Sequence, residues 1–486
     1  MNSTKVKAPA RNDLTEGPIV KKILTFALPI IAGNLLMQFY NVVDSVVIGQ
    51  YAGADAVAAV GVSNPIMMLF NALFMGLSMG ANIVISQTYG ARDMEKLKRS
   101  INTVLGLAFA VGILITVMGL TLCRPLLRLL NTPENIFNDS AIYLTVIYTG
   151  MLGNVFFNNG SGILRGMGDS RWPLIALTIS CVLNIVLDIW FVFGLHWGVA
   201  GVAWATVIGQ TLSGIVLAWR IHHFGNGIRL SPKEIVRPNK EISLNILRLG
   251  LPSGIQAMAM SLGGVITQSF SNTFGSSFIA ANSMVMRLDG FAMMPLMGLG
   301  MSSTTFVGQN MGAGKPDRAR SGVYKILCMV AVVATTMGLI MFFFSKYFML
   351  AFTNEENVIE IAVRGVRVIC FVYICMGIEQ TSGGAIRGAG VAVVPMAISI
   401  LGNFLRIPLA YFLAIRQGNY MGMFYAMAAT MTFGAIMLFS YFQFGNWREK
   451  GRVVARHQPA AASGPDAVEA DVVEPDSVPM ADDITD

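Results

Sequence analysis

Six ionisable side chains lie well inside long apolar stretches of this 486-residue sequence: Asp44, Asp188, Arg287, Asp289, Glu379 and Arg406. If these stretches cross a bilayer, each charge costs about 3 kcal/mol on insertion scales, so we expect it to pair with another charge or to serve a function. In the second half of the chain, the two acids and two arginines can neutralise one another. In the first half, Asp44 and Asp188 have no intramembrane cation with which to pair.

Two carboxylates without a counter-charge are expected to bind a cation or to hold a proton, because desolvation and mutual repulsion both disfavour the ionised pair. Asn184 precedes Asp188 by one helical turn, which places a neutral amide on the same helix face. Tyr40 and Asn41 lie about one turn before Asp44 and are secondary candidates. The pattern predicts a site for H⁺ or Na⁺ and requires no other cofactor.

Glu379 is a further secondary candidate for an ion site in the second half of the chain. It is weaker than the two aspartates, because Arg287 or Arg406 can simply neutralise it.

The composition indicates that these charged side chains have mainly apolar surroundings. Hydrophobic residues make up 54% of the chain and charged residues only 13%, against about 25% charged in soluble domains. The mean hydropathy is +0.61, which argues against a soluble enzyme. The net charge of +7 does not indicate a nucleic-acid partner, because the basic residues sit between apolar runs and not along polar faces.

The sequence contains twelve apolar runs that are long enough to cross the hydrocarbon core as helices. We expect them at 23–48, 57–86, 101–122, 140–164, 173–195, 199–219, 246–270, 278–307, 322–345, 365–386, 392–415 and 421–445. Their length and continuous hydrophobicity predict helices, since transmembrane strands are about ten residues long and alternate. The fold class is therefore an all-α membrane protein.

The charge of the loops predicts the orientation of these helices. Of the 34 Lys and Arg residues, 26 lie in the N-terminal segment, the even-numbered loops and the stretch from Arg448 to Arg456. Cytoplasmic loops carry the excess of Lys and Arg, so both termini should be cytoplasmic. An even number of crossings requires the same result. In a bacterium the location would be the inner membrane.

An internal repeat organises the chain. Three motifs recur at a spacing of 222 or 223 residues: Leu28-Pro29 as Leu251-Pro252, Gln87-x-x-Gly90-Ala91 as Gln309-x-x-Gly312-Ala313, and Arg165-Gly-x-Gly168 as Arg387-Gly-x-Gly390. Because each half has six crossings, the two halves run parallel, which is a known plan of transporters with the substrate path between the halves.

The repeat and the loops predict five segments. An N-terminal cytoplasmic segment covers 1–22, the first six helices cover 23–219, and a charged linker covers 220–245. The second six helices cover 246–447, followed by a cytoplasmic tail at 448–486. From about 457 the tail has eight acidic residues and no Lys or Arg, a composition typical of disorder.

As an ensemble, the motifs resemble those of the multidrug and toxic compound extrusion (MATE) transporters. The resemblance covers residues 20 to about 447 and is carried by Pro29 with Tyr40-Asn-Val-Val-Asp44, by the glutamine and arginine motifs of both halves, by Asn184-x-x-x-Asp188 and by Gly201-Val-Ala-Trp-Ala-Thr206.

This resemblance implies two six-helix lobes around a central cavity, and export of cationic or amphiphilic compounds in exchange for H⁺ or Na⁺ by alternating access. It implies an ion site in the first lobe at Asp44, Asn184, Asp188 and Thr206, with Na⁺ as a possible occupant, and a helix kink at Pro29. One branch of the family also has a glutamate in the seventh helix. This chain reads Gln256-Ala-Met-Ala-Met260 there, without a carboxylate.

Two other classes of protein are weaker alternatives. A flippase for a lipid-linked saccharide must hold a pyrophosphate with Arg or Lys, and only Arg287 and Arg406 are available inside the predicted helices. An enzyme or an ATP-driven pump finds no support, because the sequence has neither a P-loop nor a His-x-x-x-His motif. We expect a monomer in the lipid bilayer, acting on small organic molecules.

Overall fold

A computed structural model describes residues 13–224 and 230–450 of the chain, and in these ranges the regular structure is entirely helical. The first half contains α1 (Ile19–Val47), α2 (Ala54–Gly90), α3 (Met94–Leu129), α4 (Glu134–Thr149), α5 (Met151–Gly166), α6 (Arg171–Asp188) and α7 (Gly198–His222). A short helix, α8 (Pro232–Val236), follows. The second half contains α9 (Lys240–Asn272), α10 (Ser276–Gly312), α11 (Pro316–Leu350), α12 (Glu356–Ile369), α13 (Tyr373–Gly388), α14 (Val393–Ala410), α15 (Met421–Phe444) and α16 (Trp447–Lys450). The acidic tail from 457 lies outside the described residues.

Ten of these helical stretches are long and apolar enough to cross a membrane. An eleventh crossing is the pair α4 and α5, which is bent by 50° at Gly150 within the predicted segment 140–164. The remaining predicted segment, 278–307, corresponds to α10, which has 37 residues but carries polar runs such as Ser302–Thr305. Several helices extend beyond their predicted ends because they continue through the polar loops, as α3 does at both ends.

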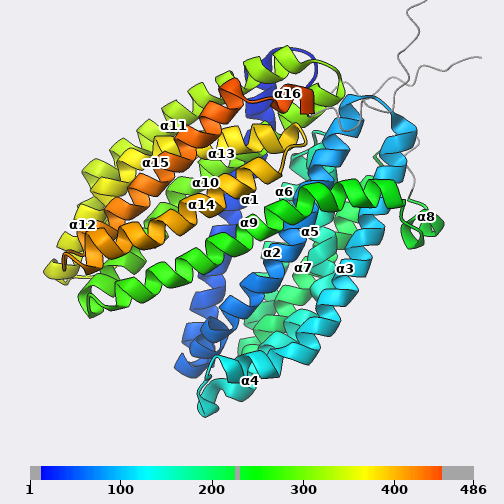
Figure 1. Cartoon of the computed structure of the whole chain (residues 1–486). Coiled ribbons are helices and arrows are strands. Elements are labelled where there is room, and N and C mark those ends of the chain that lie inside the picture. Colours follow the sequence, from blue (N-terminus) through cyan, green and yellow to red (C-terminus); the bar gives the residue numbers. More distant parts are fainter. Residues whose placement is uncertain (1–12, 225–229, 451–486) are drawn as a thin grey trace, which may run out of the picture.

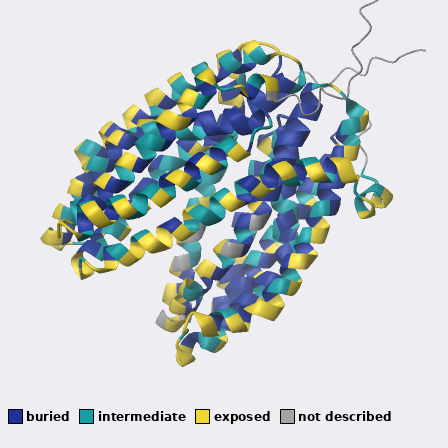
Figure 2. Ribbon diagram, viewed as in Figure 1, coloured by how far each residue is buried: buried dark blue, intermediate teal, exposed yellow. Residues whose placement is uncertain are grey.

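The outer surface of the molecule is apolar. Large side chains such as Leu114, Ile215, Phe343 and Phe404 are between 56% and 66% exposed. Figure 2 shows the buried residues gathered inside the helix bundles and at the end where they meet, with exposed residues on the outside. A surface of this kind is stable only in contact with lipid, so the chain is a multi-pass membrane protein.

The helices form two bundles that meet at one end and diverge toward the other (Figure 1). We call the bundle of α1–α7 the N-lobe and the bundle of α9–α15 the C-lobe. The end at which they meet, formed by the α2–α3 and α10–α11 connections, is called the closed end. This arrangement confirms the two parallel lobes predicted from the repeat.

The most extensive contact between the lobes is the crossing of α2 with α9, and it depends on glycine. A Cβ atom on Gly76 would lie 2.6 Å from the carbonyl oxygen of Gly250, and one on Gly80 would lie 2.3 Å from that of Ile246. Small residues four apart on both helices let the backbones approach closely, which is the main source of packing energy between helices in lipid.

The equivalent crossing of the repeat, between α1 and α10, is built differently. Gly298 of α10 faces the side chain of Ile31 of α1, and the rings of Phe39 and Phe291 make an edge contact with centroids 6.5 Å apart. This contact is therefore made by side chains. The two crossings share a position in the repeat but differ in how closely the backbones approach.

The linker between the lobes docks on the N-lobe. Asn102 of α3 donates to Glu234 Oε2 at 2.6 Å, and its own oxygen accepts from the backbone N–H of Ser231 at 3.2 Å. These bonds hold α8 against α3. The described part of the linker that precedes α9 thus lies against α3.

Replacing Gly80 by Val is expected to separate α2 from α9, because the new side chain would overlap backbone atoms that cannot rotate away. Overpacking costs about 1–3 kcal/mol, so the melting temperature of the purified protein in detergent should fall by several degrees. Gly61→Val is the matched control, since no atom lies within 4 Å of a Cβ at Gly61. Equal melting temperatures for the two variants would contradict this role of the crossing.

Candidate functional site

The two aspartates singled out by the sequence come together in the N-lobe. Asp44 lies near the end of α1 and Asp188 is the last residue of α6, and their carboxyl groups are within hydrogen-bonding reach of each other. A π-helical stretch follows each helix, at Ile48–Ala52 and at Ile189–Gly194. Such wider turns are frequent at functional sites, where they interrupt the regular ladder.

Asn184 and Thr206 complete this group. The Asn184 amide nitrogen donates to Asp188 Oδ2 at 2.8 Å and its oxygen accepts from the backbone N–H of Thr206 at 3.1 Å. We assign the amide this way because the opposite orientation would point its oxygen at the carboxylate. Asn184 therefore links α6 to α7 at the level of Asp188.

Two tyrosines border the carboxyl pair. The hydroxyl groups of Tyr40 and Thr206 are hydrogen-bonded at 3.1 Å. Tyr143 of α4 is 5% exposed and lies close enough to both aspartates to interact electrostatically with them. The sequence does not predict Tyr143 at this position, because a tyrosine inside an apolar run carries no distinguishing signal. The side chain of Asn41 is not among those that the structure describes.

The pair has unused capacity to bind a cation. Asp44 Oδ1 and Asp188 Oδ1 are buried without a hydrogen-bond partner, and Asp188 is fully buried. Ionised carboxylates only accept hydrogen bonds, so the contact between them requires either a shared proton or a cation between the oxygens. The surrounding groups supply oxygen ligands, which suit a hard cation and not a transition metal.

In the C-lobe, Glu379 of α13 has basic neighbours. Arg387 and Arg406 both lie close enough to attract its carboxylate, and Arg406 also donates from Nε to Thr430 Oγ1 at 3.2 Å. Of the two arginines that the sequence offered for neutralising Glu379, Arg406 lies near it, and Arg387 is an additional source of charge. Within the described residues neither forms an ion pair with Glu379.

The other charged pair of the C-lobe does not form. Arg287 is on the exposed face of α10, whereas Asp289 is buried and is hydrogen-bonded to Tyr373. Residues two apart on a helix point in different directions, so a net charge of zero among these side chains does not mean that Arg287 pairs with Asp289.

The glutamine motifs of the repeat meet at the closed end. Gln87 Nε2 of the N-lobe donates to the carbonyl of Gly388 in the C-lobe at 2.9 Å, and Gln309 Nε2 of the C-lobe donates to that of Gly166 in the N-lobe at 2.8 Å. Both glutamines are buried. The two bonds are related by the internal repeat, so each lobe holds the other in the same way.

The glycines of the same motifs allow this contact. A Cβ atom on Gly90 would lie 1.9 Å from the carbonyl oxygen of Gln309, and one on Gly312 would lie 1.9 Å from that of Gln87. The helix ends therefore touch backbone to backbone. No other residue type fits at these two positions without separating the lobes.

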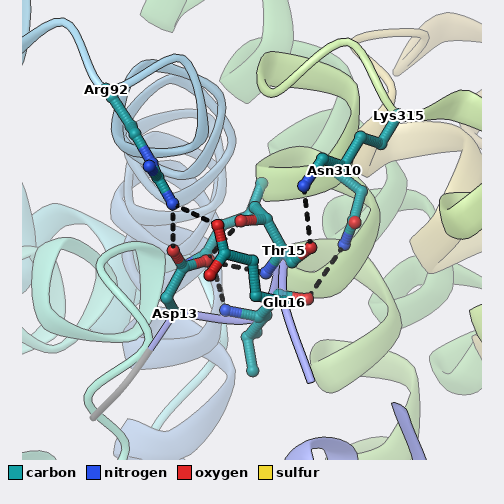
Figure 3. A network of polar contacts seen from close by, with 8 residues as sticks. Asp13, Thr15, Glu16, Arg92, Asn310 and Lys315 are labelled. Carbon is teal, nitrogen blue, oxygen red and sulfur yellow. Dashed lines mark hydrogen bonds and ion pairs between the residues drawn. The ribbon is translucent and has the colours of Figure 1, made fainter. Parts of the chain in front are cut away.

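A short segment before α1 also bridges the lobes at the closed end (Figure 3). Asp13 accepts from Arg92 of the N-lobe at 3.1 Å, whereas the carbonyl of Thr15 accepts from Lys315 Nζ of the C-lobe at 3.2 Å. The backbone N–H of Leu14 donates to Gln309 Oε1 at 3.0 Å. We call residues 13–17 the N-terminal strap.

Two small cavities lie between the closed end and the carboxyl pair. One, of about 90 Å³, lies between the lobes and includes Arg165 and Asn158 in its lining. The other, of about 50 Å³, lies within the N-lobe and is lined by Asn158, Tyr40 and Gln210 among others. Asn158 belongs to both, so polar groups continue from the inner side of the closed end to Tyr40, which borders the carboxyl pair.

Replacing Gln87 and Gln309 together by Ala is expected to loosen the closed end, because each lost bond is worth about 1 kcal/mol, or about fivefold in population. Spin labels on Glu95→Cys and Asp317→Cys, both exposed near the closed end, would report a broader and longer distance distribution. Gln268→Ala, which removes an exposed bond within α9, is the control. Unchanged distances in the double variant would argue against the clamp.

Asp13→Asn is expected to release the N-terminal strap. Although burial raises the pKa of Asp13, hydrogen bonds from Thr15 and Arg92 hold that pKa below its usual value. The contact is therefore complete above about pH 4 and is lost only as pH falls through the lowered pKa. Hydrogen exchange of residues 13–17 at pH 7 should be faster in Asp13→Asn. Glu16→Gln removes a solvent-exposed ion pair with the same Arg92 and should have a smaller effect, because exposed ion pairs contribute little to stability.

Comparison with known proteins places the chain in a family. The profile of the MatE family matches twice, over residues 29–190 and 252–412. The two matches are offset by 223 residues at their starts and 222 at their ends, which is the spacing of the repeated motifs. Each match falls within one lobe.

Relatives and solved structures agree with this result. The probable multidrug resistance protein YoeA of Bacillus subtilis is 28% identical over 87% of this chain and 93% of its own, and the probable multidrug resistance protein NorM of Thermotoga maritima is 27% identical over 90% and 95%. A MOP-superfamily transporter from Pyrococcus furiosus has the same fold, with a TM-score of 0.84 at 23% identity over 90% of this chain and 98% of that one. The chain is a member of the MatE family of multidrug efflux transporters.

Proposed function

We propose that this protein exports cationic or amphiphilic compounds across the membrane in exchange for H⁺ or Na⁺. The observation that carries the proposal is the contact between Asp44 and Asp188, two buried carboxyl groups with unpartnered oxygens. Within residues 13–224 and 230–450, no ion pair involves either of them. A site of this kind is stable only when it holds a proton or a cation.

Coupling needs the ion and the exported compound to bind two states of the transporter with different affinity. The described conformation is held at the closed end by the glutamine clamp and the N-terminal strap, while the lobes diverge at the opposite end. Release of an ion toward the closed end requires that clamp to open. The polar groups around Asn158 offer a route from the ion site to that end.

Helix α1 is the element that would couple the two ends. It follows the N-terminal strap, passes Pro29 in its interior and carries Tyr40 and Asp44 near its far end. Proline removes one backbone hydrogen bond and permits a bend at low cost. Occupation of the carboxyl pair would thus bias the shape of a helix that also contacts the C-lobe.

The flippase alternative finds less support in this geometry. A pyrophosphate needs several guanidinium or ammonium groups around one cavity. Arg287 is on an exposed helix face, and Arg406 lies close enough to Glu379 to interact with its carboxylate. Arg165 is the single basic residue among the described residues that line the cavity between the lobes.

We also propose that the closed end faces the cytoplasm. It carries Arg92, Lys315 and Arg318, which belong to the loops rich in Lys and Arg. Both termini would then be cytoplasmic, and the protein would act as a monomer in a bacterial inner membrane.

Asp44→Asn and Asp188→Asn are each expected to reduce gradient-driven ethidium transport in proteoliposomes by at least tenfold, because neither variant can hold a cation between two carboxylates. Asp55→Asn, which removes an exposed carboxylate at the start of α2, should retain transport. Full transport by Asp44→Asn would contradict the proposed site.

The coupling ion can be identified in the same vesicles by imposing a Na⁺ gradient and then a pH gradient separately. Transport should respond to one of them and not to an equal gradient of choline. If neither gradient drives transport in the wild-type protein, the antiport proposal is wrong.

A further inference from the structure

The cavity between the lobes is lined by a positively charged side chain, Arg165, which is not part of the proposed ion-coupling site. Arg165 ends α5 at the inner side of the closed end, and its Nε atom is buried without a hydrogen-bond partner. Among the residues that the structure describes, no ion pair involves Arg165. A guanidinium inside a membrane protein without a counter-charge calls for an anion at that position.

The repeat provides an internal comparison. Arg387 occupies the equivalent position at the end of α13, where Nη1 donates to Gln256 Oε1 at 3.4 Å and the carboxylate of Glu379 is close enough to attract it. Both arginines lie at the C-terminal end of a helix, where the helix dipole favours a cation equally. The Nε atom of Arg387 is also buried without a partner, so the two arginines differ in their other contacts. The repeat has Phe157 where the C-lobe has Glu379, and among the described residues Arg165 makes no hydrogen bond and no ion pair.

The surroundings of Arg165 suit an amphiphilic molecule. The cavity of about 90 Å³ exceeds what one water molecule needs and can accept a carboxylate group. Its wall combines amide and methionine side chains from both lobes: Asn82, Asn158, Met75, Met79 and Met301. Methionine adapts to varied apolar shapes, and Met75 is 57% exposed, so the cavity is continuous with the molecular surface.

The position of Arg165 also connects ligand binding with the closed end. Its neighbour Gly166 gives the carbonyl that accepts from Gln309, and Asn82 accepts from Thr305 of the C-lobe at 3.3 Å. A group held by Arg165 therefore lies directly inside the clamp. A compound that leaves at that end would lose its contact with Arg165 last. A compound that enters at that end would make this contact first.

We propose that Arg165 forms an anion-accepting subsite that binds the carboxylate of an amphiphilic substrate. A compound with both a cationic part and a carboxylate would then bind with its carboxylate at Arg165. This inference rests on the proposed export function. It assigns a role in binding to a residue that lies apart from the aspartate pair of the N-lobe.

The test uses two dyes that differ in one group. Tetramethylrhodamine carries a free carboxylate and is zwitterionic, whereas its methyl ester is a cation. Binding of each to purified full-length protein in nanodiscs is measured by fluorescence anisotropy at pH 7.5. Arg165→Gln should weaken binding of the acid by at least about tenfold, the effect of losing a charge-assisted hydrogen bond. Binding of the ester should change less than twofold.

Two further variants make the result specific. Arg165→Lys keeps the charge and should retain most of the affinity for the acid. Arg128→Gln, which removes an exposed charge at the end of α3, should leave both affinities unchanged. Retained binding of the ester in Arg165→Gln shows that the variant is folded.

Three results would overturn the subsite. They are an equal loss for acid and ester in Arg165→Gln, an unchanged affinity for the acid in that variant, and a wild-type protein that binds the ester but not the acid. The third leaves export of cations intact. Binding of neither dye by the wild-type protein contradicts the export function and the subsite together.

Discussion

The reciprocal contact at the closed end is the constraint on which the rest of the structure depends. Two glutamines cross between the lobes to carbonyl groups of Gly388 and Gly166, and two glycines let the same helix ends touch. Because the bonds are related by the repeat, they can break together when the lobes separate. Buried hydrogen bonds of this kind are individually weak, which suits the opening of this contact that the proposed export requires.

The carboxyl pair of Asp44 and Asp188 is far from this clamp, and α1 joins the two. Asp44 is the twenty-sixth residue of α1, so at about 1.5 Å per residue it lies roughly 37 Å along the helix from its start. The start of the same helix follows the strap that is bonded to Arg92, Lys315 and Gln309. A change in α1 caused by occupation of the carboxyl pair can thus reach the clamp through one continuous element, without a long chain of side chains.

Duplication produced two lobes of one architecture whose buried charges now differ. In the N-lobe the acids are paired with each other, and the arginine of the repeated motif has no acid. In the C-lobe Glu379 lies near both Arg387 and Arg406, and Arg406 stands at the position of Asn184 in the repeat. The N-lobe therefore retains unsatisfied charge of both signs, which is the property that binding of ions and of charged compounds requires.

The sequence by itself determined the membrane-spanning helices and the duplication, and it singled out Asp44 and Asp188 as charges within apolar runs. These follow from local properties: the length of apolar runs, the spacing of motifs, and the cost of a charge within a run. They needed no knowledge of which helices touch. The family resemblance likewise depended on motifs that can be read along the chain.

Only the tertiary structure decided which distant groups meet. The approach of Tyr143 to the aspartates, the exchange of bonds between Gln87 and Gln309 motifs, and the place of Arg165 in a cavity all join helices far apart in the sequence. Arg165 in particular lies one residue beyond the predicted end of its helix at 164, so hydropathy alone assigned it to a loop. Periodicity predicts which residues share one face of a helix. Packing within and between the two lobes decides which other helix that face contacts.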